Sequence, residues 1–253
     1  MINVLINGFE GRMGQMVLKQ IECSDIFNCN GGIGKNDDIY QIDTIPDVII
    51  DFSTPTGTLS ILRYAEEKNI PVVIATTGFS DKQLQGIKNA STKIPIFKSA
   101  NMSYELNVLL SLVGKLAEEL SDSDIEIVET HHNKKVDSPS GTALMLYEVI
   151  NNSLGNSMHY EFGRYSKKAP RSKNEIGIHS IRGGTEIGKH SVLFLEDNQT
   201  LEITHTVNSR VVFANGALKA AKFLIGQPAG LYNMNDLIAL SRNQKYNGGN
   251  NNA

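Results

Sequence analysis

Short apolar runs alternate with longer amphipathic stretches through the first hundred residues. The apolar runs are four to six residues long and cover residues 2–6, 47–52, 71–75 and 94–97. Helical periodicity follows the first three runs, and a weaker strand-like run with glycines lies at 27–33. Buried strands that alternate with helices are typical of βαβ units on a parallel sheet. The pattern therefore predicts an α/β domain with a Rossmann-type parallel sheet.

The pattern changes near residue 99. A long amphipathic helix is predicted at 103–120, a strand at 124–130 and a second helix at 140–154. From residue 177 onward polar and apolar positions alternate, and two strands flank the pair Asp197-Asn198, which favours a hairpin turn. This half is predicted to be an α+β domain with an open, mostly antiparallel sheet.

A last helix, predicted at 215–224, carries an apolar face that needs a partner surface. We expect it to return to the first domain, which makes that domain discontinuous. Residues 1–100 and 213–253 are then the dinucleotide-binding domain, and residues 101–212 are the substrate-binding and oligomerisation domain.

Three glycines with the spacing G-x-x-G-x-x-G follow the first strand, at Gly8, Gly11 and Gly14. Glycines here let the backbone approach a pyrophosphate, and the helix that follows presents N–H groups and a positive dipole end to it. A tight structural turn is the alternative, but the position after the first strand of a βαβ array favours dinucleotide binding. Arg12 adds a cation beside the phosphates.

The end of the second strand is where Rossmann folds distinguish NAD from NADP. An acid there holds the ribose 2′-hydroxyl of NAD, and a cation holds the 2′-phosphate of NADP. Gly34 and Lys35 occupy this place, and the acids Asp37 and Asp38 follow. The sequence therefore predicts use of both NADPH and NADH with NADPH preferred, unless Lys35 is an ordinary solvated lysine.

Composition and charge narrow the function classes. The 253 residues are 40% hydrophobic and 20% charged, with a net charge of −3. These values fit a globular chain and give no reason to expect a nucleic-acid partner. The N-terminal apolar run is too short for a signal peptide, and no run approaches the ~20 residues of a membrane span. We expect a soluble, cytoplasmic protein in which Cys23 and Cys29 are buried free thiols.

The most informative segment is 129–142, where two histidines and two lysines fall within five residues. It joins a predicted strand to a predicted helix, and such loops concentrate function. Ser140 is a candidate N-cap, which directs the backbone of Gly141 and Thr142 toward an anion. A proton-donating side chain beside an anion site suits an anionic substrate. The ligand spacing predicts no metal site, and a solvated basic loop is the alternative reading.

The segment ETHHNKKVDSPSGTA resembles the signature of the 4-hydroxy-tetrahydrodipicolinate reductase family. Further blocks agree, in order along nearly the whole chain: GFEGRMG at 8–14, DFSTP at 51–55, ATTG at 75–78, SANMS at 99–103, IHSIRGG at 178–184 and FANGALKAA at 213–221. The resemblance implies that a small cyclic dicarboxylate is reduced by NADPH or NADH in lysine and diaminopimelate biosynthesis. It also implies a homotetramer built through the open sheet of the second domain.

The resemblance implies roles for individual residues as well. His131 corresponds to the proton donor, and Lys135 to a second catalytic residue that donates a proton or stabilises charge. Substrate contacts correspond to His132, Gly141 and Thr142. Cofactor contacts correspond to Gly8, Phe9, Glu10, Gly11, Arg12 and Met13, to Ala75, Thr76 and Thr77, and to Ser99, Ala100, Asn101 and Met102. Lys135, the helix N-terminus and Arg182 are expected to balance the charge of the two carboxylates.

One departure from the family bears on the choice of cofactor, because many members have an acidic residue where this chain has Gly34.

Two other functions compete with the reductase. A dinucleotide-sensing regulator needs no proton donor beside an anion site, so the segment with His131 and Lys135 counts against it. Another Rossmann dehydrogenase of aspartate-family metabolism, of the semialdehyde type, needs a cysteine nucleophile beyond the cofactor domain. Cys23 and Cys29 lie within that domain, so the sequence favours the reductase.

Overall fold

The structure is a computed structural model that describes residues 1–165 and 169–248. The chain divides into two compact units. The first comprises Met1–Tyr104 and Arg210–Ala253, and the second comprises Glu105–Ser209. The end of the predicted segment 213–253, residues 249–253, lies outside the described residues.

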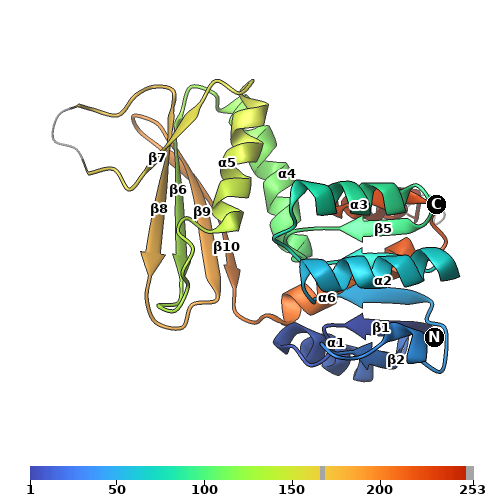
Figure 1. The fold of residues 1–253 in the computed structure, drawn as a ribbon. Coiled ribbons are helices and arrows are strands. Elements are labelled where there is room, and N and C mark those ends of the chain that lie inside the picture. Colours follow the sequence, from blue (N-terminus) through green and yellow to red (C-terminus); the bar gives the residue numbers. More distant parts are fainter. Residues whose placement is uncertain (166–168, 249–253) are drawn as a thin grey trace. The chain divides into compact units, whose positions relative to one another are not determined.

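Unit 1 is built on a parallel six-stranded sheet with the order β11-β5-β4-β3-β1-β2 (Figure 1). Its strands are β1 (Ile2–Asn7), β2 (Phe27–Ile33), β3 (Val48–Asp51), β4 (Val72–Ile74), β5 (Pro95–Lys98) and β11 (Gly230–Tyr232). The central strands are buried on both faces, which is why they read as continuous apolar runs. The predicted Rossmann-type sheet is confirmed.

Two sets of helices cover the two faces of this sheet. The helices of unit 1 are α1 (Arg12–Glu22), α2 (Pro55–Lys68), α3 (Asp81–Ser91), α6 (Val211–Leu224) and α7 (Met234–Gly248), with a 3-10 turn at Ile39–Gln41. Val4 and Ile6 pack toward α1, α6 and α7, whereas Leu5 packs toward α2 and α3. In α6, Gly216 allows a close approach, because a Cβ there would lie 1.7 Å from the carbonyl oxygen of Met102. The late helix therefore belongs to the core of the first unit.

Unit 2 has a five-stranded sheet with the order β10-β9-β6-β8-β7, one face of which packs on helices. Its elements are α4 (Tyr104–Glu119), β6 (Asp124–His131), α5 (Gly141–Ser153), β7 (His159–Phe162), β8 (Glu175–Arg182), β9 (Gly188–Leu195) and β10 (Thr200–Val207). The open sheet is present, but it is mixed rather than mostly antiparallel. Strand β6 pairs antiparallel with β9 and parallel with β8, since the chain crosses over through α5 and then forms β7 and β8 in the same direction as β6.

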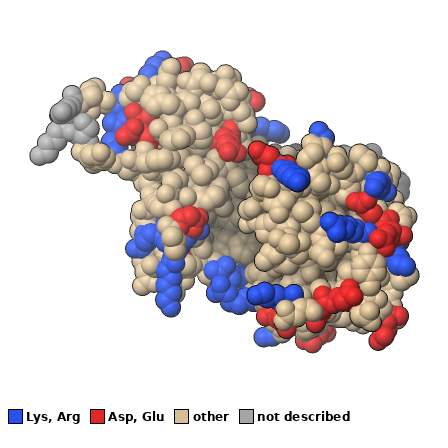
Figure 2. Space-filling model, in the orientation of Figure 1, with Lys and Arg blue, Asp and Glu red and all other residues tan. Residues whose placement is uncertain are grey.

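The surface corrects one smaller expectation. Cys23 is exposed at the end of α1 and Cys29 is half-buried in β2, so the prediction of two buried thiols was wrong. On the face drawn in Figure 2, basic and acidic side chains occur on both units, as a net charge of −3 leads one to expect. Within the described residues, no helix combines the length and the apolarity that crossing a bilayer requires.

Candidate active site

The predicted cofactor residues of unit 1 lie at one edge of its sheet. The loop at 8–13 follows β1, Lys35 follows β2, and the segments 75–77 and 99–102 follow β4 and β5. The strands are parallel, so their carboxyl ends share this edge. In open α/β sheets ligands bind at the carboxyl edge, and the structure thus brings these segments together.

The glycine loop has the shape that a phosphate requires. Gly8 has a φ of +82°, and a Cβ there would lie 2.5 Å from the carbonyl oxygen of Phe52. A Cβ on Gly14 would lie 2.3 Å from the carbonyl oxygen of Gly8. Gly11 is the N-cap of α1, so no side chain caps the first N–H groups of the helix. The first turn of α1 also holds no acidic residue. The residues present therefore fit the pyrophosphate of a dinucleotide.

A buried carboxylate that sequence reasoning missed joins three strand ends beneath this edge. Asp51, at the end of β3, accepts hydrogen bonds from Asn7 (2.7 Å), Ser53 (2.5 Å), Thr58 (2.5 Å) and Thr76 (2.9 Å). Burial raises the pKa of Asp51, and these donors oppose that shift. The motif DFSTP at 51–55 was the available signal, and its first residue positions the loops that carry the predicted cofactor contacts.

The end of β2 is more acidic than the sequence suggested. The backbone N–H of Gly34 donates to the Asp37 carboxylate at 2.7 Å. A Cβ on Gly34 would lie 2.7 Å from the carboxyl carbon of Glu10, a residue of the glycine loop. Two carboxylates therefore border the position where the sequence shows a glycine, and one of them comes from another loop.

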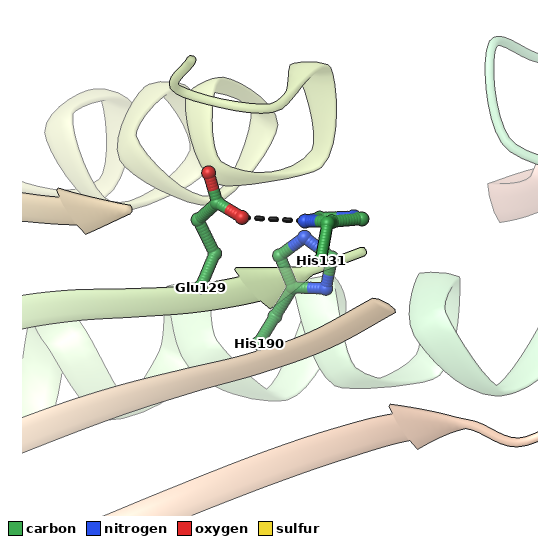
Figure 3. A group of neighbouring side chains, drawn as sticks. All are labelled: Glu129, His131 and His190. Atoms are coloured by element: carbon green, nitrogen blue, oxygen red, sulfur yellow. Dashed lines mark hydrogen bonds and ion pairs between the residues drawn. The ribbon is translucent and has the colours of Figure 1, made fainter. Parts of the chain in front are cut away.

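In unit 2 the predicted catalytic histidine belongs to a buried polar group (Figure 3). Glu129 and His131 lie on β6, and His190 lies on β9 directly opposite Glu129 in the strand register. His131 Nδ1 lies 2.5 Å from Glu129 Oε2, and the rings of His131 and His190 meet edge to face with centroids 5.0 Å apart. All three residues are buried.

Several donors hold the Glu129 carboxylate. Arg182, on the neighbouring strand β8, donates to both carboxylate oxygens at 2.8 and 2.7 Å. The Ser140 N–H donates to Oε1 at 3.2 Å, and His131 shares Oε2. Burial on its own raises the pKa of Glu129, but the hydrogen bonds led by Arg182 outweigh it and hold the pKa at about 2.

The two histidines differ in their surroundings. Burial lowers the pKa of His131, and its bond to the Glu129 carboxylate partly offsets the effect. Burial lowers the pKa of His190 to about 4, and proximity to His131 adds to the shift. His190 Nε2 lies 3.0 Å from Ser140 Oγ, which also caps α5. His190 is therefore neutral at pH 7, and its role is to pack and to hold the helix cap.

The other predicted residues of unit 2 lie in the loop after β6 or at the start of α5. Lys135 Nζ contacts both carboxylate oxygens of Asp137 at 2.8 Å, so its charge is partly neutralised within the loop. The backbone N–H of His132 donates to the Glu186 carbonyl at 2.7 Å, which pins the loop to the β8–β9 connection. Gly141 and Thr142 are the first two residues of α5.

Arg182 requires a correction. We expected it to balance the substrate's charge, but its guanidinium binds Glu129 in a bidentate pair and also donates to the carbonyls of Ile181 and Asp137. The positive charge of Arg182 is therefore balanced by Glu129 within the protein. Ligand atoms of Glu129, His131 and His190 lie within 4.8 Å of one another, yet both Glu129 oxygens already accept hydrogen bonds. The carboxylate is thus poorly available to a metal ion.

We expect this group to make the stability of the protein acid-sensitive. A histidine whose folded pKa of about 4 lies below its ordinary 6.5 loses stabilisation as the pH falls from 6.5 to 4. A carboxylate whose pKa falls from 4.5 to about 2 loses its contribution as the pH falls through that lower range. Each shift corresponds to roughly 3 kcal/mol, since one pKa unit is worth about 1.4 kcal/mol. Urea unfolding at pH 7, 5.5, 4 and 3 measures the decline.

The variant His190→Gln separates the two steps. It removes the titrating ring and retains a side chain that can bond Ser140. We expect its free energy of unfolding to fall less than that of the wild type between pH 6.5 and 4, and equally below pH 4. An identical pH dependence for both proteins would contradict the assignment of the upper step to His190.

Taken together, the dinucleotide-shaped loop of unit 1 and the buried group of Glu129, His131 and His190 in unit 2 are typical of a two-domain, dinucleotide-dependent oxidoreductase. Residues 2–102 match the family model described as dihydrodipicolinate reductase, N-terminus, and residues 105–238 match the one described as dihydrodipicolinate reductase, C-terminus. The chain belongs to the dihydrodipicolinate reductase family. It is an NAD(P)H-dependent reductase of lysine and diaminopimelate biosynthesis.

Individual relatives match this chain over almost their full length. The chain is 47% identical to the 4-hydroxy-tetrahydrodipicolinate reductase of Caldanaerobacter subterraneus subsp. tengcongensis, over 94% of this chain and 98% of the relative. It is 44% identical to that of Alkaliphilus oremlandii, over 94% and 99%. Among solved structures, a dipicolinate-bound dihydrodipicolinate reductase from Paenisporosarcina sp. TG-14 superposes with a TM-score of 0.75 at 23% identity, covering 92% of this chain and 97% of that one. At this identity the superposition supports the fold.

Proposed function

We propose that this chain converts 4-hydroxy-tetrahydrodipicolinate to tetrahydrodipicolinate, with His131 as the proton donor. Replacing the ring hydroxyl by hydrogen consumes one hydride and one proton and releases one water. A bound nicotinamide supplies the hydride. The observation that carries the proposal is the histidine of the family segment held by a buried, ionised carboxylate, which is an arrangement suited to proton transfer.

The remaining residues of unit 2 recognise the dicarboxylate. Lys135 exchanges part of its contact with Asp137 for a substrate carboxylate, and His132 adds a second polar contact. Gly141 and Thr142 direct the N-terminus of α5 to the other carboxylate. The dipicolinate bound by the Paenisporosarcina sp. TG-14 protein has the same pair of carboxylates, so we expect it to bind here as an inhibitor.

Unit 1 binds the cofactor along the carboxyl edge of its sheet. The glycine loop, with Gly8, Phe9, Glu10, Gly11, Arg12 and Met13, holds the pyrophosphate and the adenosine half. The segments 75–77 and 99–102 follow the more distant strands β4 and β5 and hold the nicotinamide half. Residues 1–100 and 213–253 thus form the cofactor domain, and residues 101–212 the substrate domain.

The sequence-based preference for NADPH changes with the structure in view. A 2′-phosphate at the end of β2 meets the carboxylates of Glu10 and Asp37, whereas ribose hydroxyls can donate to them. We therefore predict that NADH is the better cofactor. The variant Glu10→Gln removes one charge and raises the NADPH/NADH ratio of kcat/KM by about tenfold, because a charge pair near a protein surface is worth roughly 1–4 kcal/mol.

Steady-state rates with each cofactor at low salt test this prediction. The control is Glu22→Gln, which removes an exposed carboxylate at the far end of α1 and leaves the ratio unchanged. Gly34→Glu is a less direct test, since its Cβ would displace the flexible Glu10 carboxylate and so move the group under test. A wild type that prefers NADPH, or a ratio insensitive to Glu10→Gln, would show that Glu10 does not face the ribose.

The proposal extends to the assembly and the location of the protein. The face of the second sheet turned away from α4 and α5 is free of helices in the described part of unit 2, and we propose that it pairs with other copies to form a homotetramer in the cytoplasm. Neither nucleic acid nor membrane is required as a partner. Light scattering of the purified protein measures the mass of the assembly.

A cofactor-oxidation assay tests the reaction itself. Freshly generated 4-hydroxy-tetrahydrodipicolinate is added to enzyme with NADH or NADPH, and absorbance at the reduced nicotinamide band is followed. The proposed function requires substrate-dependent oxidation and competitive inhibition by dipicolinate. Binding of NADH without any turnover would instead support a dinucleotide-sensing protein.

A further inference from the structure

We propose that Glu129 is a positioning residue that holds His131 as its Nδ1–H tautomer, so that the catalytic proton leaves and returns at Nε2. This inference rests on the proposed role of His131 as proton donor. It assigns a task to the buried group in Figure 3 and to Arg182, which the substrate-binding scheme leaves without one.

The carboxylate is fixed before it meets the histidine. Arg182 binds it through two parallel N–H···O bonds from the adjacent strand, where His131 and Arg182 are register partners. The Ser140 N–H adds a third donor from the loop that precedes α5. Glu129 itself is fully buried. A carboxylate anchored from two elements has little freedom to turn, so it imposes its geometry on the ring beside it.

The anchored carboxylate dictates the tautomer. An ionised carboxylate only accepts hydrogen bonds, so the 2.5 Å contact with Nδ1 requires a proton on that nitrogen. In the neutral ring the lone pair is then on Nε2, and in the charged ring the second proton is there. Hydrogen bonding of one ring nitrogen in this way determines the reactive nitrogen of a histidine.

The surroundings leave Nε2 uncovered by a side chain on the facing strand. Residue 188, at the start of β9, is glycine, and a Cβ there would lie 3.1 Å from Nε2. The charged and titratable groups around the ring are Glu129 on β6, Arg182 on β8, His190 on β9 and Lys135 in the loop. Glu129 and Arg182 neutralise each other, and His190 remains neutral. His131 is therefore the group of this set that is suited to carry a proton at Nε2.

The variant Glu129→Gln tests the proposal by kinetics. It keeps the shape of the side chain and removes its charge. We expect kcat to fall by roughly 10²-fold, a part of the 10²–10⁴ that a positioned acid contributes, while the KM for NADH stays constant. Because Glu129 raises the pKa of His131, the loss of activity on the alkaline side should begin at a lower pH in the variant.

A matched control lies on the same strand. Glu126 also pairs with a histidine and an arginine, at 2.7 Å to His179 and 3.1 Å to Arg171, but on the opposite face of the sheet. Glu126→Gln should leave the pH profile of kcat unchanged; because Glu126 lies on the sheet face proposed to pair with other copies, light scattering checks in parallel that its assembly is intact. A similar loss in both variants would overturn the proposal, because it would indicate a general effect of charge removal on the sheet.

A double-mutant cycle separates this inference from the function on which it rests. Once His131 is alanine, adding Glu129→Gln should cost no further activity. If His131→Ala leaves turnover intact, the proposed proton donor is wrong and the inference falls with it. If His131→Ala is inactive but Glu129→Gln behaves as wild type, the positioning role alone is wrong.

Nitrogen-15 NMR of histidine-labelled wild type shows which ring nitrogen of His131 is protonated. This test does not depend on whether Glu129→Gln folds. The His131 signals are assigned by their loss in His131→Ala. We expect Nδ1 to stay protonated through the titration and Nε2 to gain and lose the proton. A neutral ring protonated at Nε2, or an even mixture of tautomers, would overturn the proposal.

Discussion

We expect His131→Ala to lower kcat of the reductase by ~10²–10⁴-fold, the usual contribution of a positioned general acid. The ring is buried at the end of β6 against an ionised carboxylate, and nothing else in the described buried group combines that position with a free ring nitrogen. The Kd for NADH should hardly change, because the cofactor residues belong to the other unit of the chain. Stopped-flow single turnovers and NADH fluorescence titration measure the two quantities.

Lys135→Ala is the informative comparison for this experiment. Lys135 supplies charge rather than a held proton, so its loss should weaken dipicolinate inhibition as well as turnover. A charged hydrogen bond contributes about 1.5–3 kcal/mol, which is roughly a ten- to hundredfold change in the inhibition constant. His131→Ala should leave that constant closer to wild type. If instead His131→Ala weakens dipicolinate inhibition and Lys135→Ala leaves the inhibition constant near wild type, Lys135 is the donor and His131 the substrate contact.

Much of the fold was predictable from sequence because unit 1 buries its strands on both faces. The runs around β1, β3 and β4 are apolar for this reason, and hydrophobicity alone marks them. β7 and β11 were missed. All four residues of β7 are exposed and β11 is only three residues long, and each strand pairs on one side only, at the edge of its sheet. Such strands depend on the neighbouring strand rather than on their own pattern.

In the candidate site, too, the residues marked by local sequence were predicted and the contacts between distant segments were not. His131 and Lys135 were identified because they lie close together in one segment of sequence. The grouping around His131 and Glu129 was not, because it comes from strand register: Arg182, which the sequence assigned to the substrate, lies opposite His131, and His190 lies opposite Glu129. A shift of one residue in either pairing would turn these side chains to the other face. Glu10 was among the predicted cofactor contacts, but its place beside Gly34 was not predicted, since its carboxyl reaches Gly34 across two loops.

The largest effect on stability is expected from Arg182→Met, which should reduce the free energy of unfolding by about 3–5 kcal/mol at pH 7. The side-chain volume is nearly kept, but the buried Glu129 carboxylate loses both of its charged hydrogen bonds. Burial then raises the pKa of Glu129 without the opposing effect of Arg182. Protonation of Glu129 becomes favourable in the variant, so the difference from wild type should shrink between pH 7 and pH 4.

The double variant Arg182→Met with Glu129→Leu distinguishes an unpaired charge from lost packing. Replacing both members of a buried ion pair by apolar side chains is often neutral or stabilising, so the double variant should recover most of the stability that the single variant loses. It should also lose the pH dependence between pH 4 and 7 that the single variant gains. Urea unfolding at both pH values measures this. A double variant as unstable as Arg182→Met would show that Arg182 stabilises the chain mainly through the carbonyls of Ile181 and Asp137.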